Sequence, residues 1–189
     1  MAIERIYKQT ESAKLFDKVI GCLQDGLGEL SWLNHIFGRA ERLCKVFEGK
    51  RIYTPAVYFG RGEYEPLTPD NTGLGNYCFF VMDEPQRIME AQGLYNRVRS
   101  PFSLIVWVDM RTIGQKDDRN TEAVKEAVLK AVRRAWLKNG SCTIERIYER
   151  AENVFSGFTL DECDNQYLMS PYWGMRLTGE LITNEDCEV

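Results

Sequence analysis

The residues best suited to catalysis are few in this chain, and the first is its single histidine. His35 lies in the stretch SWLNHIFGR, between aromatic and aliphatic residues. A Ser-His-Asp or Cys-His mechanism would have to use this one imidazole as its base. Because a histidine in such surroundings is more often packed or capping, we expect His35 to be structural. A site with three histidine ligands is impossible.

The cysteines are spread through the chain without any close pair. No C-x-x-C pattern occurs, and the six thiols are Cys22, Cys44, Cys78, Cys142, Cys163 and Cys187. Metal sites and redox dithiols usually need two cysteines within one short loop, and disulfide frameworks are typical of small secreted domains. The spacing therefore favours six reduced thiols in a cytoplasmic protein.

Carboxylates offer the remaining route to catalysis. Asp109 with Asp117 and Asp118, or Asp109 with Asp117 and Glu162, could hold a divalent cation in a small metal-dependent enzyme. Acidic residues in front of a helix are more often caps that interact with its dipole. The acids around Cys163 fit a solvated turn. We therefore expect no catalytic residue, no bound metal and no cofactor.

A segment rich in glycine and proline, GRGEYEPLTPDNTGLGN, occupies residues 60–76. Its glycines resemble a phosphate-binding loop only superficially. Such a loop needs a strand before it, a helix after it, and a lysine and hydroxyl or a downstream acid in register, and these are missing. The segment predicts a long, turn-rich loop, and loops of that length are usually functional or mobile.

Length and charge limit the function classes. The 189 residues, 44% of them hydrophobic, predict one domain over 1–189, with an ordered core at 10–183 and a frayed tail at 184–189. A net charge of −4 gives no general attraction for a phosphate backbone, so nucleic acid is not expected as the main partner. The longest apolar run, 102–108 with one serine in it, is far shorter than the roughly 20 residues that cross a bilayer. We expect neither a membrane nor a secreted chain.

The periodicity of apolar residues predicts two main helices. Residues 11–30 have an apolar stripe at three- and four-residue steps, with Thr10 or Ser12 as the N-cap, and a second short helical stretch is expected over 36–43. Residues 121–138 have the clearest helical stripe, with Asn120 as the cap.

The same reading predicts the strands. CKVFEGKRIYTPAVYFG indicates a hairpin that turns at residues 48–50, with Pro55 at a sheet edge or a bulge. NYCFFVMD and PFSLIVWVDM are apolar on both faces, which is typical of central strands. CTIERIYER fits a strand, although a helix also fits, and PQRIMEAQG within 84–100 could form two helical turns. The order of these elements along the chain predicts an α+β fold. We expect a mainly antiparallel sheet without parallel βαβ repeats, with the N-terminal helix and the second long helix packed on one of its faces.

The last predicted strand, PYWGMRLTGELI at 171–182, has one apolar and one polar face. Tyr172, Arg176, Thr178 and Glu180 alternate with Trp173, Met175, Leu177 and Leu181. The chain also holds nine tyrosines and four tryptophans, residue types that interface centres favour. These aromatics either fill a small core or form contact surfaces, and contact is a simpler use for them than catalysis.

The order of elements resembles that of a known family. The strand PFSLIVWVDMR, the helix NTEAVKEAVLKAVRRAW and the strands IERIYERAENVF and PYWGMRLTGELI look like the second half of phage tail terminator (tail completion, minor tail) proteins of prophage type. In that family an N-terminal helix leads into a region like IYTPAVYFGRGEY. The resemblance spans roughly residues 10–183, and it departs from the family at 60–76 and 84–100.

The resemblance implies a structural subunit and not an enzyme. Such a subunit forms a ring, expected to be a hexamer, on the end of the tail tube, stops its polymerisation and joins it to the head-completion proteins. Its location would be the virion, and the bacterial host cytoplasm during assembly. A head-completion or connector subunit of the same particle is the alternative. By polarity and position, Arg176, Thr178 and Glu180 would face a neighbouring subunit or the tube lumen, and Arg61, Glu63 and Tyr64 an adjoining ring.

Overall fold

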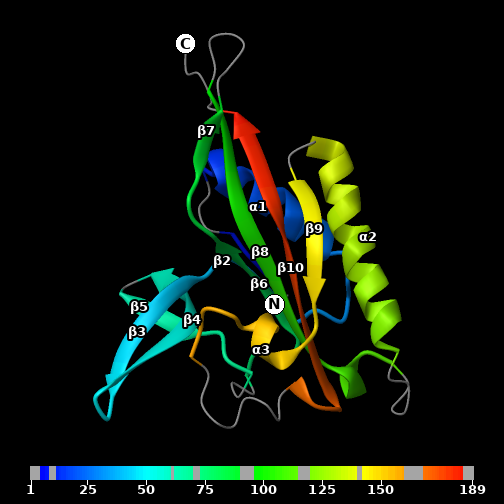
Figure 1. Ribbon diagram of the computed structural model, residues 1–189. Coiled ribbons are helices and arrows are strands. Elements are labelled where there is room, and N and C mark those ends of the chain that lie inside the picture. The colour runs from blue at the N-terminus through cyan, green and yellow to red at the C-terminus, as the bar shows by residue number, and fades with distance from the viewer. Residues whose placement is uncertain are drawn as a thin grey trace.

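The computed structural model describes residues 5–8, 12–60, 62–69, 73–89, 96–114, 120–139, 142–159 and 168–184. The fold is α+β with mainly antiparallel strands, as predicted. In chain order the elements are β1 (Ile6–Tyr7), α1 (Leu15–Leu27), β2 (His35–Arg39), β3 (Glu41–Phe47), β4 (Lys50–Gly60), β5 (Glu63–Pro66), β6 (Tyr77–Met82), β7 (Arg87–Met89), β8 (Arg97–Asp109), the 3₁₀ helix η1 (Met110–Thr112), α2 (Thr121–Asn139), β9 (Cys142–Tyr148), α3 (Ala151–Val154) and β10 (Tyr172–Asn184). A large sheet carries the two long helices, and a small sheet projects beside it (Figure 1).

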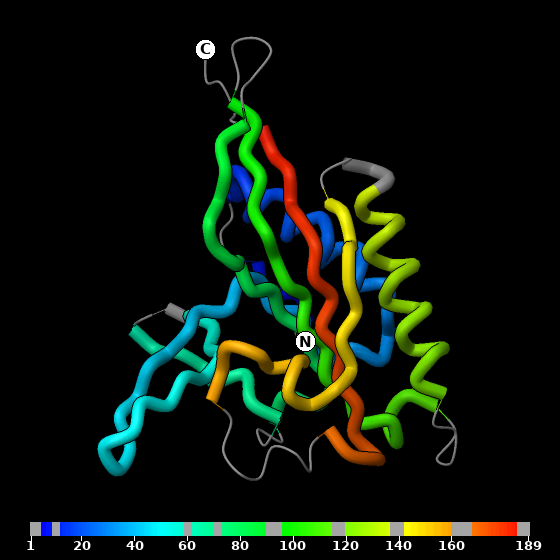
Figure 2. The backbone as a smooth tube through the Cα atoms, in the orientation of Figure 1, coloured from blue at the N-terminus to red at the C-terminus, as the bar shows by residue number. Residues whose placement is uncertain are grey.

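Two long strands form the centre of the large sheet. Its strand order is β1-β2-β6-β8-β10-β9, with β7 also paired to β8. β8 and β10 have 13 residues each and pair antiparallel along their whole length, from Tyr172 opposite Asp109 to Asn184 opposite Arg97. The smooth trace in Figure 2 shows them side by side. The predictions of strands at PFSLIVWVDM, NYCFFVMD and PYWGMRLTGELI are confirmed.

The β1 side of this sheet differs from the prediction. β1 pairs parallel with β2, and β2 pairs parallel with β6. Since α1 connects β1 to β2, these three elements form a βαβ unit, which the sequence pattern did not predict. β1 has two residues, too few for an alternating pattern to reveal it.

Both long helices pack on the same face of the large sheet, as predicted. Their apolar sides meet alternate residues of the strands, and the buried core between them includes Phe16, Ile20, Leu23, Leu104, Val106, Val128, Val132, Met175 and Leu177. α1 and α2 approach closely at Gly26, where a Cβ would lie 2.8 Å from Ala135 Cβ and 2.9 Å from the Ala131 carbonyl oxygen. This glycine therefore sets how near the two helices can lie.

One of the predicted helix caps is correct. Asn120 Oδ1 accepts a hydrogen bond of 3.0 Å from the Ala123 amide at the start of α2. The prediction of Thr10 or Ser12 for α1 is wrong, because the helix begins at Leu15 and Lys14 occupies the N-cap without a side-chain hydrogen bond. None of the described helices is long and apolar enough to span a membrane.

Two helical predictions are wrong. Residues 36–43 belong to β2 and β3, because Ile36 and Phe37 are both buried but on opposite faces of the sheet, and a short strand of this kind also fits helical spacing. Within PQRIMEAQG, Arg87–Met89 is the strand β7, paired with β8. Residues 90–95 lie outside the described residues.

The small sheet has the order β3-β4-β5, and we call it the arm. The predicted hairpin is confirmed: β3 and β4 pair from Glu41 opposite Ala56 to Phe47 opposite Lys50. The turn has φ of 48° at Glu48 and 76° at Gly49. Positive φ at both positions is what a two-residue hairpin turn needs to match the twist of its strands.

The rest of the arm corrects two predictions. Segment 60–76 is not a loop throughout, because Glu63–Pro66 forms β5 and pairs with β4. Pro55 lies in the central strand and not at an edge or bulge. The ladder with β5 begins one residue later, at Ala56, and the Pro55 carbonyl accepts a hydrogen bond of 2.8 Å from the Leu67 amide. The proline thus falls just beyond the end of the β5 ladder.

Candidate interface surfaces

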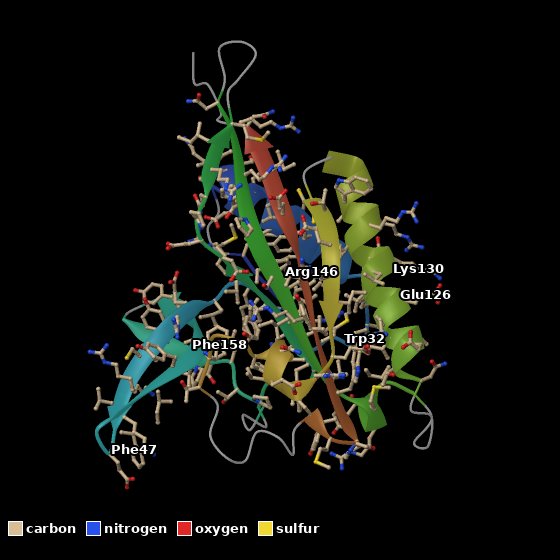
Figure 3. All side chains as sticks on the ribbon, viewed as in Figure 1. Trp32, Phe47, Glu126, Lys130, Arg146 and Phe158 are labelled. Carbon is tan, nitrogen blue, oxygen red and sulfur yellow. The ribbon has the colours of Figure 1, made fainter. Side chains whose placement is uncertain are left out.

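The arm is anchored at its base and free at its tip. Val57 of β4 and Leu67, which follows β5, are buried with Phe79 and Phe155 in the core on the face of the large sheet opposite the two long helices. The Thr159 amide also donates a hydrogen bond of 2.7 Å to a carbonyl of β4. Phe47 marks the far tip in Figure 3, well away from the body. The arm therefore extends from a packed base.

Large apolar side chains gather on this arm. Val46 is 71% exposed, Phe47 62%, Tyr58 54% and Tyr64 44%. Single exposed hydrophobic residues are common, whereas a concentration of them on one small projecting sheet makes that sheet a candidate interaction surface. The Tyr58 and Tyr64 rings also contact each other across β4 and β5, at a centroid distance of 5.2 Å.

Two of the three contact residues that the sequence predicts in segment 60–76 lie on the arm. Glu63 and Tyr64 are exposed residues of β5. Arg61 lies outside the described residues. That these residues contact an adjoining subunit stays a prediction. The sequence did not single out Val46 and Phe47, since their exposure depends on how the hairpin leaves the body.

The polar face of β10 is partly covered by its own chain. Arg176 Nε donates to Ser103 Oγ at 2.9 Å, Nη1 donates to the Ser156 carbonyl at 2.6 Å, and Nη2 lies 3.6 Å from Asp83 Oδ1. Its side chain is only 11% exposed. Burial lowers the pKa of Arg176, and the charge of Asp83 opposes that shift. Arg176 is therefore largely enclosed by its own chain, and its contact with a neighbouring subunit or a tube lumen stays a prediction.

The other two predicted residues on β10 are half-buried. Thr178 lies between Ser103 of β8 and Arg146 of β9 in the sheet register. Glu180 forms an ion pair of 3.0 Å with Arg99. A contact of Thr178 or Glu180 with a neighbour or a tube lumen stays a prediction.

His35 occupies a packed position. The Tyr7 hydroxyl and His35 Nδ1 are 3.1 Å apart, and the imidazole stacks on Phe37 with ring centroids 5.7 Å apart. Burial lowers the pKa of His35, and a hydrogen bond with the Gly73 backbone opposes that shift. His35 is therefore packed among aromatic side chains, in line with the structural role that the sequence favours.

Of the carboxylates considered for a metal site, the structure describes only Asp109. Asp109 accepts hydrogen bonds from the Arg111 side chain, the shortest being 2.6 Å from Nη2, and these bonds lower the pKa of Asp109. Asp117, Asp118 and Glu162 lie outside the described residues. Across the parts of the chain that the structure describes, no group of three or more His, Cys, Asp or Glu side chains is placed to hold a metal ion.

The described thiols are unpaired. Cys22, Cys44, Cys78 and Cys142 are free, while Cys163 and Cys187 lie outside the described residues. Burial raises the pKa of the Cys142 thiol to about 12, and raises that of Cys78 as well. These two thiols are protonated at neutral pH and are poor nucleophiles.

An apolar groove lies on the other side of the molecule, between α2 and β9. Its volume is about 340 Å³, and it is lined by Leu129, Val132, Arg133, Trp136, Cys142, Thr143 and Ile144. Trp136 on α2 is 36% exposed and Ile147 on β9 is 40% exposed. The sequence did not reveal this groove, because its walls come from a helix and an edge strand whose spacing only the fold sets.

Comparison with known protein families found no matching family model, and comparison with curated proteins found no match either. A function for this chain is therefore inferred from the geometry of the arm and of the groove between α2 and β9, together with the resemblance in the order of elements.

Proposed function

We propose that this chain is a structural subunit of a phage or prophage particle, similar to tail terminators, which assembles into a ring through its arm. The ring would cap the tail tube and join it to head-completion proteins. The subunit would act in the virion and, during assembly, in the bacterial cytoplasm. The order of elements suggests the family, and the exposed apolar tip of the arm is the observation that carries the proposal.

A head-to-tail ring needs two different patches on each subunit. The arm and the α2–β9 side lie at opposite sides of the large sheet (Figure 1). One is a projection with exposed Val46 and Phe47, and the other is a hollow lined mainly by apolar side chains. This separation is what allows each subunit to contact a different neighbour on either side.

Burial of the arm tip would contribute substantially to such an interface. Full burial of a valine or phenylalanine side chain stabilises by about 1.5–3 kcal/mol. Since Val46 and Phe47 are each exposed by roughly two thirds, docking both would contribute about 2–4 kcal/mol per contact. That corresponds to roughly a 30- to 800-fold change in association constant.

The test compares the wild-type chain with a variant in which Val46 and Phe47 are both serine. Sedimentation velocity and negative-stain microscopy across concentration should show rings for the wild type and loss of rings for the variant, with unchanged circular dichroism. Ile88→Ser is the matched control, because it removes an equally exposed side chain, 74% exposed, outside the arm. Rings that persist in the arm variant would contradict the proposal.

A second assay separates the two joints of the particle. Rings mixed with purified tail tubes should bind at the tube ends and stop further growth. Rings that form but leave the tubes unbound would favour a head-completion or connector subunit instead.

A further inference from the structure

The strand β9 forms one edge of the large sheet. Within the described part of the chain, β9 pairs with β10 on one side and has no strand on the other. An edge strand presents unpaired backbone N–H and C=O groups, which are ready to pair with another strand. We propose that β9 pairs antiparallel with β9 of a second copy of this chain, in a twofold dimer that extends the sheet.

A bulge gives β9 an unusual distribution of apolar residues. Ile147 lies opposite Leu177, and Ile144 lies opposite Gly179, so both isoleucines face the helix side although they are three residues apart. In a regular strand, residues three apart point to opposite faces. The register shift between Thr178 and Gly179 makes the difference, because Glu145 is an extra residue there.

Cys142, opposite Leu181, also faces the helix side, whereas the other four residues of β9 face the other side of the sheet. Tyr148 and Thr143 lie opposite polar residues of β10, and Glu145 and Arg146 together oppose Thr178. Glu145 and Arg146 are both exposed. Over residues 143–148, the order in which side chains face one or the other side of the sheet is therefore symmetric about the midpoint between Glu145 and Arg146.

This symmetry selects one register for a twofold pair. When an antiparallel partner strand is centred between Glu145 and Arg146, the two isoleucines lie opposite each other and the two charges lie opposite their complements. The pairs are Ile144 with Ile147, Glu145 with Arg146 and Thr143 with Tyr148, and each pair occurs twice by symmetry. A shift of one residue in either direction is unfavourable. One shift places Glu145 opposite Glu145 and Ile144 opposite Arg146. The other shift places Arg146 opposite Arg146 and Ile144 opposite Tyr148, which faces the other side of the sheet.

The groove beside β9 fits the same partner. Ile144 is one of its lining residues, together with Leu129, Val132 and Trp136 of α2. In the selected register, Ile147 of the second copy lies beside Ile144 on the helix side, next to this groove. Ile147 is 40% exposed in the single chain, so the pairing covers it.

This dimer goes beyond the proposed ring function: it does not use the arm, and it occupies the α2–β9 side in place of a ring neighbour. The dimer is therefore tested in the Val46→Ser/Phe47→Ser variant, the background chain, in which the arm contacts are removed. Sedimentation equilibrium is measured for Glu145→Arg, Arg146→Glu and the double charge swap. The matched control is Glu41→Arg, which makes the same charge change on β3, an edge strand of the arm.

The expected result is a monomer–dimer equilibrium in the background chain. Each single swap turns two opposite-charge pairs into two like-charge pairs and should weaken the dimer about 10- to 100-fold. The double swap restores both pairs, so its dimerisation should return to within about threefold of the background value. Glu41→Arg should leave the dimer unchanged.

Hydrogen exchange gives an independent readout. The β9 amides should exchange more slowly as the concentration rises, and only in variants that dimerise. A background chain that stays monomeric, single swaps that leave the dimer intact, or a double swap that fails to recover it would each overturn the proposal. None of these outcomes depends on ring formation, so failure of the ring function remains distinguishable.

Discussion

Replacing Gly179 with alanine should strongly destabilise the fold, because the backbone of β9 occupies the space that a Cβ would need. The Cβ would overlap the Thr143 carbonyl oxygen, and it would lie 2.8 Å from the Thr143 carbonyl carbon and 3.1 Å from Ile144 Cα. These are backbone atoms in a paired strand, so no side-chain rotation relieves the overlap. β9 would have to move away from β10.

The size of the effect follows from what that movement disrupts. Pairing of β9 with β10 holds Cys142 in the core, where it is 4% exposed, and positions Ile144 against the cluster around α2. Overpacking typically costs 1–3 kcal/mol, and a clash with a paired backbone belongs at the upper end or above it, so about 3–5 kcal/mol is expected. For a chain of this length that lowers the melting temperature by roughly 6–20 °C.

Thermal and urea unfolding followed by circular dichroism measure this effect. Gly21→Ala is the control, since a Cβ there meets nothing within 4 Å. Gly21 lies inside α1, where alanine is the better helix former, so this variant should gain up to about 1 kcal/mol. If Gly179→Ala melted within about 2 °C of the wild type, the close approach of β9 to β10 and the bulge derived from it would be wrong.

Three further predictions concern single side chains. Burial lowers the pKa of His35 in the folded state below its usual 6.5, so the unfolded chain binds more protons and the free energy of unfolding should fall as the pH drops below about 6.5. Urea unfolding at neutral and mildly acidic pH should show that His35→Phe loses less stability than the wild type between the two pH values. An equal loss in both chains would refute the lowered pKa of His35. Arg176→Ala leaves the Ser156 carbonyl and Asp83 without this partner, so it should lower the free energy of unfolding by about 1–3 kcal/mol. An unchanged urea midpoint would show that these contacts of Arg176 do not stabilise the fold. Asn120→Ala removes the cap of α2 and should cost about 1 kcal/mol by the same assay, whereas Asn120→Asp should retain most of it.

The sequence predicted the elements whose pattern is local and strong. The stripe of α2 with its Asn120 cap and the alternation of β10 each follow from one periodicity, and the turn at Glu48 and Gly49 follows from local backbone preference. These signals depend on neighbouring residues alone, and the structure contains all of them.

The sequence-based predictions fail where tertiary packing determines the structure. Ile36 and Phe37 are adjacent in sequence but lie in different cores, so β2 reads as helix. Arg176 appears as a free polar residue in the sequence, yet Ser103, Asp83 and Ser156, which bind it, come from distant segments.

The two proposed interface surfaces could not be predicted from the sequence either. The exposure of the arm tip depends on where the hairpin leaves the body. The symmetry of β9 depends on its bulge opposite Gly179. Neither property has a signature within the residues that display it.

The role of the arm is tested most directly by the size of the assembled wild-type chain beside its Val46→Ser/Phe47→Ser variant, with and without tail tubes, measured by sedimentation velocity and imaged by microscopy. Closed rings in the wild type, and their loss in a variant that remains folded, are the expected result. A wild-type chain that forms nothing larger than a dimer up to its solubility limit, and that leaves tube ends bare, would contradict the proposed function.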